Sequence, residues 1–141
     1  MASTSPQQGT YIAFDFGLKY IGCAVGQNIT RTARGLTTLN ATNGKPKWHQ
    51  IKALVKTHQP VGFVVGLPLN MDGSESNMSH LARHFAQQLS TKTGVPAELV
   101  DERLTTKIAQ DELQQTASSR RGQSTHEIAA RYILESWFNE S

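Results

Sequence analysis

Hydrophobic positions along this chain follow two periods, which together predict a mixed α/β fold. Apolar runs at 11–16 and 61–66 are typical of buried strands, and the patterns at 20–27, 31–39 and 97–100 predict three more. Apolar residues spaced by three and four predict helices from about Trp48 to His58 and from about Met78 to Leu89. A third helix is expected around Leu104–Leu113, and a last one from about Thr125. The predicted order is β-β-β-α-β-α-β-α-α.

Turn residues separate these elements. Gly17 to Tyr20 predict a tight turn, and the glycines at 17, 22 and 26 indicate a hairpin in which backbones approach closely. Residues 40–46 and 116–123 are expected to be loops, the second of them flexible and basic. In the last helix, we expect the inward-facing residues to be Ile128, Ala129, Tyr132, Ile133 and Trp137.

This order predicts a five-stranded mixed sheet with helices on both faces. The first three strands form an antiparallel meander, and the last two add in parallel through right-handed crossovers. A chain of 141 residues fits one domain. We therefore expect a single domain at 11–141, preceded by a flexible leader at 1–10.

Composition narrows the class of protein. No apolar run approaches the ~20 residues that span a bilayer, and the first ten residues do not resemble a secretory signal. Cys23 is the only cysteine, which excludes an internal disulfide and suggests a reducing, cytoplasmic location. We expect Cys23 to be a small buried strand residue.

Charge is distributed unevenly along the chain, with a net charge of +3. Residues 1–60 carry seven lysines and arginines and a single acid, Asp15, whereas residues 61–141 hold the other ten acids. Basic surface favours a polyanionic partner such as nucleic acid, although a net charge of this size is also ordinary for a soluble protein.

Two acids stand where chemistry is expected. Asp15 interrupts the apolar run 11–16, and burying it is costly unless it is paired or binds a metal; alternatively it caps the Gly17 turn. Asp101 and Glu102 follow a strand directly, at the edge where open α/β sheets place ligands. Asp101 could cap the next helix and leave Glu102 free for a metal.

The start of the last helix offers two further candidates. Ser124 and Glu127 have capping-box spacing, which would direct Glu127 to a backbone N–H. His126 is either an exposed residue of the first turn or a metal ligand or proton relay. Convergent carboxylates favour Mg²⁺ or Mn²⁺, and such ions support phosphodiester hydrolysis.

Basic residues flank these acids. Lys19 lies four residues after Asp15, Arg103 adjoins Glu102, and Arg120 and Arg121 precede the last helix. Each is either a solvated surface residue or a contact to substrate phosphates. The solvated alternative is weakest for Arg120 and Arg121, because glycine and serines surround them.

Three segments, AFDFGLKYIGCAVGQ, VVGLPLNMDGSES and DERLTT, resemble in this order the YqgF/RuvX family. This bacterial family of pre-16S rRNA nucleases is also described as Holliday-junction-resolvase-like, and the resemblance runs from about Tyr11 to Phe138. It implies an RNase H-like fold and a cytoplasmic nuclease that matures the 5′ end of 16S rRNA. Asp15 matches the first acid of the family and Glu102 the second. His126 stands where the family has an Asp, in the pattern His126-Glu127-Ile128-Ala129-Ala130, and histidine favours Mn²⁺ over Mg²⁺.

The leading hypothesis is a metal-dependent nuclease acting on RNA, such as pre-16S rRNA or a preribosomal particle. Asp15, Glu102 and His126 would form its metal-binding and catalytic site; Lys19, Arg103, Arg120 and Arg121 would contact phosphates. A resolvase of branched DNA is an alternative, and it requires a symmetric dimer, whereas we expect a monomer or weak homodimer. A protein that binds nucleic acid or a preribosomal particle without cutting it is a further alternative.

Overall fold

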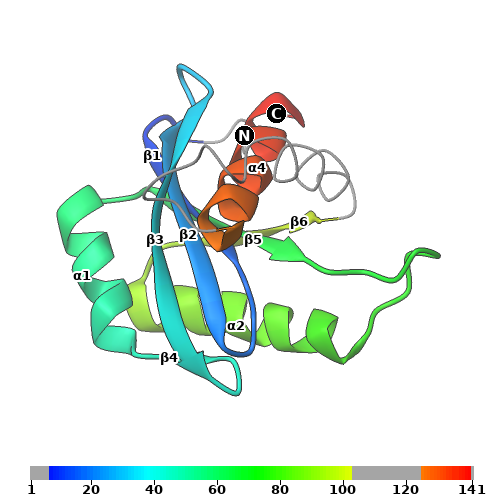
Figure 1. Cartoon of the computed structure of the whole chain (residues 1–141). Coiled ribbons are helices and arrows are strands. Elements are labelled where there is room, and N and C mark those ends of the chain that lie inside the picture. Colours follow the sequence, from blue (N-terminus) through cyan, green and yellow to red (C-terminus); the bar gives the residue numbers. More distant parts are fainter. Residues whose placement is uncertain (1–6, 103–124, 141) are drawn as a thin grey trace, which may run out of the picture.

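The computed structural model describes residues 7–102 and 125–140 and shows a mixed sheet with helices on both faces (Figure 1). Its six strands lie in the order β4-β3-β2-β1-β5-β6. The antiparallel part comprises β1 (Thr10–Asp15), β2 (Tyr20–Gln27), β3 (Thr32–Thr42) and β4 (Lys45–Pro46). The strands β5 (Gly62–Leu67) and β6 (Ala97–Asp101) add in parallel beside β1. The predicted meander and parallel extension are confirmed, with one strand more than expected.

The additional strand arises in the segment predicted to be a loop. The third strand extends to Thr42 rather than ending at 39, and a turn at Asn43 and Gly44 then pairs β4 with its end. The turn between β1 and β2 supports this extension, since the Ala41 N–H donates to the Lys19 carbonyl oxygen at 2.8 Å. A two-residue strand stabilised by such contacts leaves no periodicity in the sequence.

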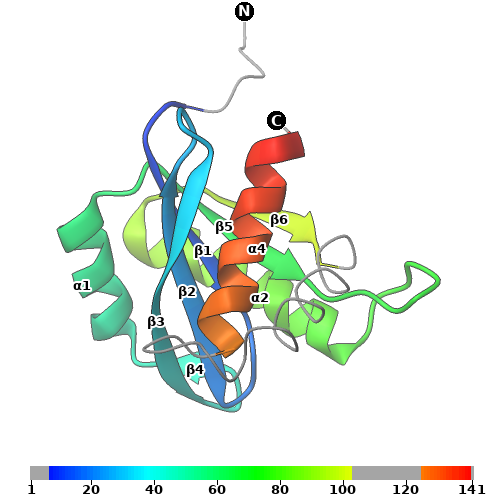
Figure 2. The same cartoon turned by 45° about the horizontal axis from the view of Figure 1, so that its top comes forward.

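Three described helices cover the sheet. Helices α1 (Trp48–His58) and α2 (Asn77–Thr93) lie on one face, and α4 (Thr125–Glu140) crosses the other (Figures 1 and 2). Ser76 caps the start of α2, and Gly94, at φ 77°, ends it. The helix expected around Leu104–Leu113 and the basic loop at 116–123 lie outside the described residues.

The core forms two layers because successive strand residues point to opposite faces of the sheet. Ile12 and Phe14 pack towards α1 and α2, whereas Tyr11 and Ala13 pack towards α4. On α4 the expected Ile128, Ile133 and Trp137 are buried, but Ala129 and Tyr132 are only half-buried. The other buried positions are Ala130, Leu134 and Phe138. Apolar residues occur around most of this helix, so the pattern alone does not fix its buried face.

The amino-terminal segment is held from Gln7 onward. β1 begins at Thr10, inside the predicted leader. Gly9 donates its N–H to Asn28 Oδ1 at 2.9 Å, and Asn28 Nδ2 donates to the Gln7 carbonyl at 3.1 Å. Within the described part of the chain, no helix has both the length and the apolar character needed to cross a membrane.

Candidate active site

Asp15 and Glu102 lie at the same edge of the sheet. Asp15 is the last residue of β1, and Glu102 directly follows β6, with β5 between these two parallel strands. The Glu102 N–H donates to the Leu67 carbonyl at 3.1 Å, so the β5–β6 ladder continues through Glu102. Parallel strands end at one edge, and this pairing therefore places the two carboxyl groups together.

Glycines on both sides of Asp15 make room for this arrangement. On β5, a Cβ atom at Gly66 would lie 3.5 Å from Glu102 Cδ and 2.6 Å from Ile133 Cδ1. On β2, Gly22 is paired with Asp15, and a Cβ there would lie 2.0 Å from the His126 carbonyl oxygen. Gly66 thus leaves space for the Ile133 side chain, with the Glu102 carboxyl group in ordinary contact beside it, and Gly22 lets the first turn of α4 rest on the sheet. The close backbone approach predicted for this hairpin is confirmed at Gly22.

The electrostatics of the acid pair follow from its burial. Burial raises the pKa of Asp15 from 3.8 to about 9, with further contributions from a hydrogen bond to the Glu102 carboxyl group and from its charge. Asp15 therefore keeps its proton at neutral pH when no cation is present. A divalent cation would take the place of that proton, and carboxylate oxygens are the ligands that Mg²⁺ and Mn²⁺ prefer. The donor set fits such an ion.

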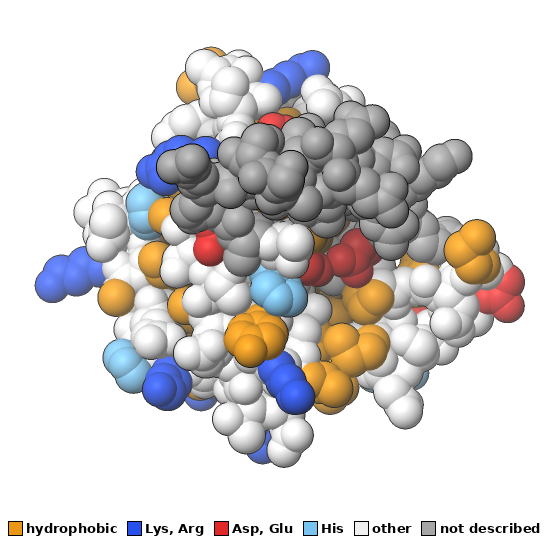
Figure 3. Space-filling view, in the orientation of Figure 1, with side chains coloured by type: hydrophobic (Ala, Val, Ile, Leu, Met, Phe, Trp, Pro, Cys, Tyr) orange, Lys and Arg blue, Asp and Glu red, His pale blue; other side chains and the backbone are white. Residues whose placement is uncertain are grey.

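His126 lies beside Tyr20, at the start of β2. The two rings are stacked with centroids 5.0 Å apart and an interplanar angle of 29°. Figure 3 shows carboxylate side chains near a histidine in the middle of this face, with hydrophobic side chains next to them. Over residues 7–102 and 125–140, no group of three or more His, Cys, Asp or Glu side chains forms a ready-made metal site. The structure thus brings Asp15 and Glu102 together and stacks His126 on Tyr20.

Glu127 faces the same side of the sheet. Its Oε2 accepts a hydrogen bond of 3.1 Å from Thr38 Oγ1. Thr38 on β3 is paired with Gly22 on β2, and Gly22 is paired with Asp15 on β1. The Thr38–Glu127 contact is therefore separated from Asp15 by the width of β2. The suggested capping partner Ser124 lies outside the described residues. The sequence analysis did not identify Thr38 or Tyr20 as site residues. An aromatic residue at the start of a strand indicates a functional site only weakly, and nothing in the sequence around Thr38 indicates one.

The remaining candidates are only partly described. Lys19 is exposed in the turn that follows Asp15, whereas Arg103, Arg120 and Arg121 lie outside the described residues. Cys23 is buried as expected, and burial raises the pKa of its thiol, with a smaller contribution from the charge of Glu127. This thiol is therefore not a nucleophile at neutral pH.

Comparison with known proteins places this geometry in context. The family model described as "RuvX: Holliday junction resolvase" matches residues 9–140. A protein of Histophilus somni named "Putative pre-16S rRNA nuclease" is 53% identical over 131 residues, covering 92% of this chain and 93% of its own length. A Coxiella burnetii protein of the same name is 44% identical over 129 residues, covering 92% of both chains.

Solved structures share the fold at low sequence identity. The Thermus thermophilus RuvC in complex with a Holliday junction substrate has a TM-score of 0.58 at 14% identity, covering 94% of each chain. The yeast mitochondrial Holliday junction resolvase Ydc2 has a TM-score of 0.51 at 11% identity, covering 91% of this chain and 77% of its own. The expected RNase H-like fold of the resolvases is therefore confirmed. With a family model that spans 9–140 and relatives about half identical over nearly their whole length, the chain belongs to the RuvX family.

Proposed function

We propose that this chain is a divalent-metal-dependent nuclease that hydrolyses phosphodiester bonds in RNA, and that precursor 16S rRNA is its substrate. The observation that carries the proposal is the half-buried, hydrogen-bonded Asp15–Glu102 pair at the carboxyl ends of β1 and β6. Membership of a family described as Holliday junction resolvases supports phosphodiester hydrolysis as the reaction. The substrate is proposed because the relatives are named as pre-16S rRNA nucleases.

The two carboxylates would hold the ion, which when bound supplies a water of lowered pKa and stabilises the leaving oxygen. The β5–β6 ladder holds the backbone of Glu102 beside β5, and the hydrogen bond between the two carboxyl groups shows that they already lie close together. Both side chains are half-buried, so a charge on the substrate phosphate would be screened less at this pair than in open solvent.

Other residues would act around this pair. His126, held by its stack on Tyr20, would be a third ligand or a proton relay. Lys19, exposed beside Asp15, would bind a substrate phosphate, and Arg103, Arg120 and Arg121 are proposed to do the same on the basis of sequence alone. We place this activity in the cytoplasm, because its proposed substrate is ribosomal RNA.

Cleavage of branched DNA is a second candidate, favoured by the description of the family model and by the RuvC–Holliday junction structure. Resolution of a four-way junction requires two sites related by symmetry, and therefore a dimer. RNA cleavage needs only one such site.

The test is cleavage of an end-labelled precursor 16S rRNA 5′ fragment with Mg²⁺, Mn²⁺ or EDTA. We expect the wild type to cut with metal, and Asp15→Asn and Glu102→Gln to lose cutting. Glu98→Gln is the matched control, because it also removes a carboxylate, in this case from β6. The glutamine oxygen can still accept the hydrogen bond that Trp137 Nε1–H donates to Glu98 in the wild type. Metal-dependent cutting by Asp15→Asn would contradict the site, and binding without cutting by the wild type would favour a non-catalytic RNA-binding factor.

A further inference from the structure

A cavity of about 410 Å³ opens on the side of the sheet covered by α1 and α2. It lies between the β3–β4 turn and one face of α2, and we call it the Trp48 pocket after the residue at the start of α1 that lines it. Its apolar part comes from Phe16, Trp48, Leu81 and Phe85. Its volume falls in the range of small-molecule sites, which is about 300–1,000 Å³.

The ionisable groups that line the Trp48 pocket are all basic. They are Lys45, His84 and Lys92, and no carboxylate is among the described residues that line it. Both lysines are exposed, so their ammonium groups can turn towards a bound ligand without breaking a buried contact. Such a lining complements a ligand that combines an apolar or aromatic body with negative charge.

The floor of the pocket is a rigid set of aromatic rings. Trp48 stacks on Phe85 with centroids 5.9 Å apart, and Phe85 contacts Phe16 at 5.3 Å. Lys92 Nζ lies 5.4 Å from the centroid of the Trp48 ring. Aromatic rings beside lysines are the combination with which proteins bind unpaired nucleotides, the rings contacting the base and the lysines the phosphates.

The pocket is joined to the candidate active site by the β1–β2 turn. Phe16 follows Asp15 in the chain but points to the opposite face of the sheet. The turn is tied to the β3–β4 hairpin, because the Gly44 N–H donates to the Leu18 carbonyl at 2.9 Å. In this turn Leu18 and Tyr20 are 44% and 47% exposed, and the exposed Lys19 lies between them in the chain. Exposed hydrophobic side chains are visible beside basic ones on this face (Figure 3).

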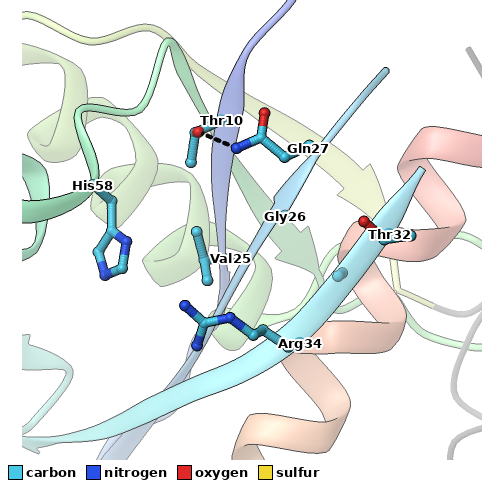
Figure 4. A pocket seen from close by; sticks show the side chains of 8 residues that line it. Thr10, Val25, Gly26, Gln27, Thr32, Arg34 and His58 are labelled. Atoms are coloured by element: carbon cyan, nitrogen blue, oxygen red, sulfur yellow. Dashed lines mark hydrogen bonds between the residues drawn. The ribbon is translucent and has the colours of Figure 1, made fainter. Parts of the chain in front are cut away.

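A second cavity, of about 300 Å³, lies at the other end of β1 (Figure 4). Arg34 and His58 approach it from β3 and from the last turn of α1, and Gln27 donates to Thr10 at its rim. The carboxyl end of a helix disfavours an anion. This cavity is also separated from Asp15 by the length of the strand, so it does not extend the active site.

We propose that the Trp48 pocket binds one unpaired nucleotide of the RNA strand that lies across Asp15 and Glu102. The base sits in the aromatic cavity, and Lys45 and Lys92 contact the adjacent phosphates. This inference rests on the proposed function, since it extends the same substrate past the β1–β2 turn. An acidic peptide with an apolar side chain would suit the same basic and aromatic lining. A nucleic-acid strand is preferred because the same strand would also reach the proposed nuclease site across the β1–β2 turn.

The test measures binding of a fluorescent single-stranded oligoribonucleotide in EDTA, where no cleavage occurs. We expect Lys45→Gln with Lys92→Gln to raise Kd by roughly 3- to 10-fold and to lower the salt slope by about 0.7 for each lysine that neutralises a phosphate in the wild type. Leu81→Glu, at a 39% exposed position, should have a similar effect by placing a carboxylate in the cavity. Lys52→Gln is the matched control, because Lys52 is exposed on α1 outside the pocket.

A second readout locates the base directly. RNA carrying 5-iodouridine should crosslink to Trp48 or Phe16 on irradiation, and Leu81→Glu should remove that crosslink. Unchanged Kd and crosslinks outside the pocket would overturn the inference, even if RNA is cleaved at the Asp15 site. It would also be overturned, in favour of a protein segment, if the pocket variants bind RNA normally but no longer bind an acidic tryptophan-containing peptide. Pocket-dependent RNA binding without any cleavage would support the pocket and refute the proposed nuclease.

Discussion

Replacing Asp15 with Asn should stabilise the metal-free protein while abolishing cleavage. Burial and Glu102 raise the pKa of Asp15 from 3.8 to about 9 in the folded state. The folded protein therefore binds a proton that the unfolded chain releases above pH 3.8, so folding stability decreases as the pH rises from about 4 to about 9. The Asn variant has no proton to lose at this position, and its amide can donate to the Glu102 carboxylate.

The magnitude follows from the difference in pKa. Each pKa unit corresponds to about 1.4 kcal/mol, so at pH 7 the wild type loses up to about 4 kcal/mol that the variant retains. An imperfectly paired buried amide costs about 1–3 kcal/mol. We therefore expect a net gain of about 2 kcal/mol at pH 7. Because the cost of the amide does not depend on pH, the gain at pH 8 should exceed that at pH 5 by up to about 4 kcal/mol.

Urea unfolding followed by circular dichroism at pH 5 and pH 8 in EDTA measures this difference. Glu98→Gln serves as the control, since Glu98 lies on the same edge strand but outside the buried pair. In Mn²⁺ the order should reverse, because the wild-type carboxylates bind the ion and the variant lacks one of them. A gain that is equal at the two pH values, or a variant that is less stable than the wild type at pH 8, would refute the reasoning.

Four further results are expected. Gly22→Ala should cost several kcal/mol and disturb the start of α4, because its Cβ would lie 2.0 Å from a backbone oxygen; chemical unfolding with near-ultraviolet circular dichroism measures both effects. Gly66→Ala should cost only about 1–3 kcal/mol in the same assay, since the flexible Ile133 Cδ1 can move away; an equal cost at both glycines would contradict this. Cys23 should react with a thiol reagent at pH 8 only on unfolding, and rapid labelling of the native protein would show that the buried assignment is wrong. Changing Arg120 and Arg121 to Ala should reduce the salt slope of RNA binding by up to about 1.4, and an unchanged slope would remove both from the interface.

Local patterns in the sequence predicted most of the fold. The strand at 20–27 and the helix from Trp48 to His58 have the expected bounds, because period and turn residues agree there. The buried face of α4 was only partly predicted, since Ala129 and Tyr132 are as apolar as the residues that are buried in their place. Strand β4 was missed because two residues are too short to show a period, although Asn43 and Gly44, both with positive φ, form the two-residue turn of a local hairpin.

The candidate site also has a part that the sequence predicted and a part that it did not. Asp15 and Glu102 could be predicted because acids at strand ends violate the apolar pattern. The sequence does not show that β5 lies between their two strands, with Glu102 paired to Leu67. Contacts such as Thr38 with Glu127 join residues 89 positions apart, and only the strand order and the docking of α4 bring them together.

The separation of the two acids along the chain has a consequence for biosynthesis. Asp15 lies on the first strand to be synthesised, Glu102 follows the last strand described, and the first turn of α4 contacts Gly22 from near the end of the chain. A nascent chain that has not released these later segments would hold Asp15 without Glu102, and the proposed site would be incomplete. Since domains generally fold as units during synthesis, the proposed site would assemble only after the segment that carries Glu102 has left the ribosome.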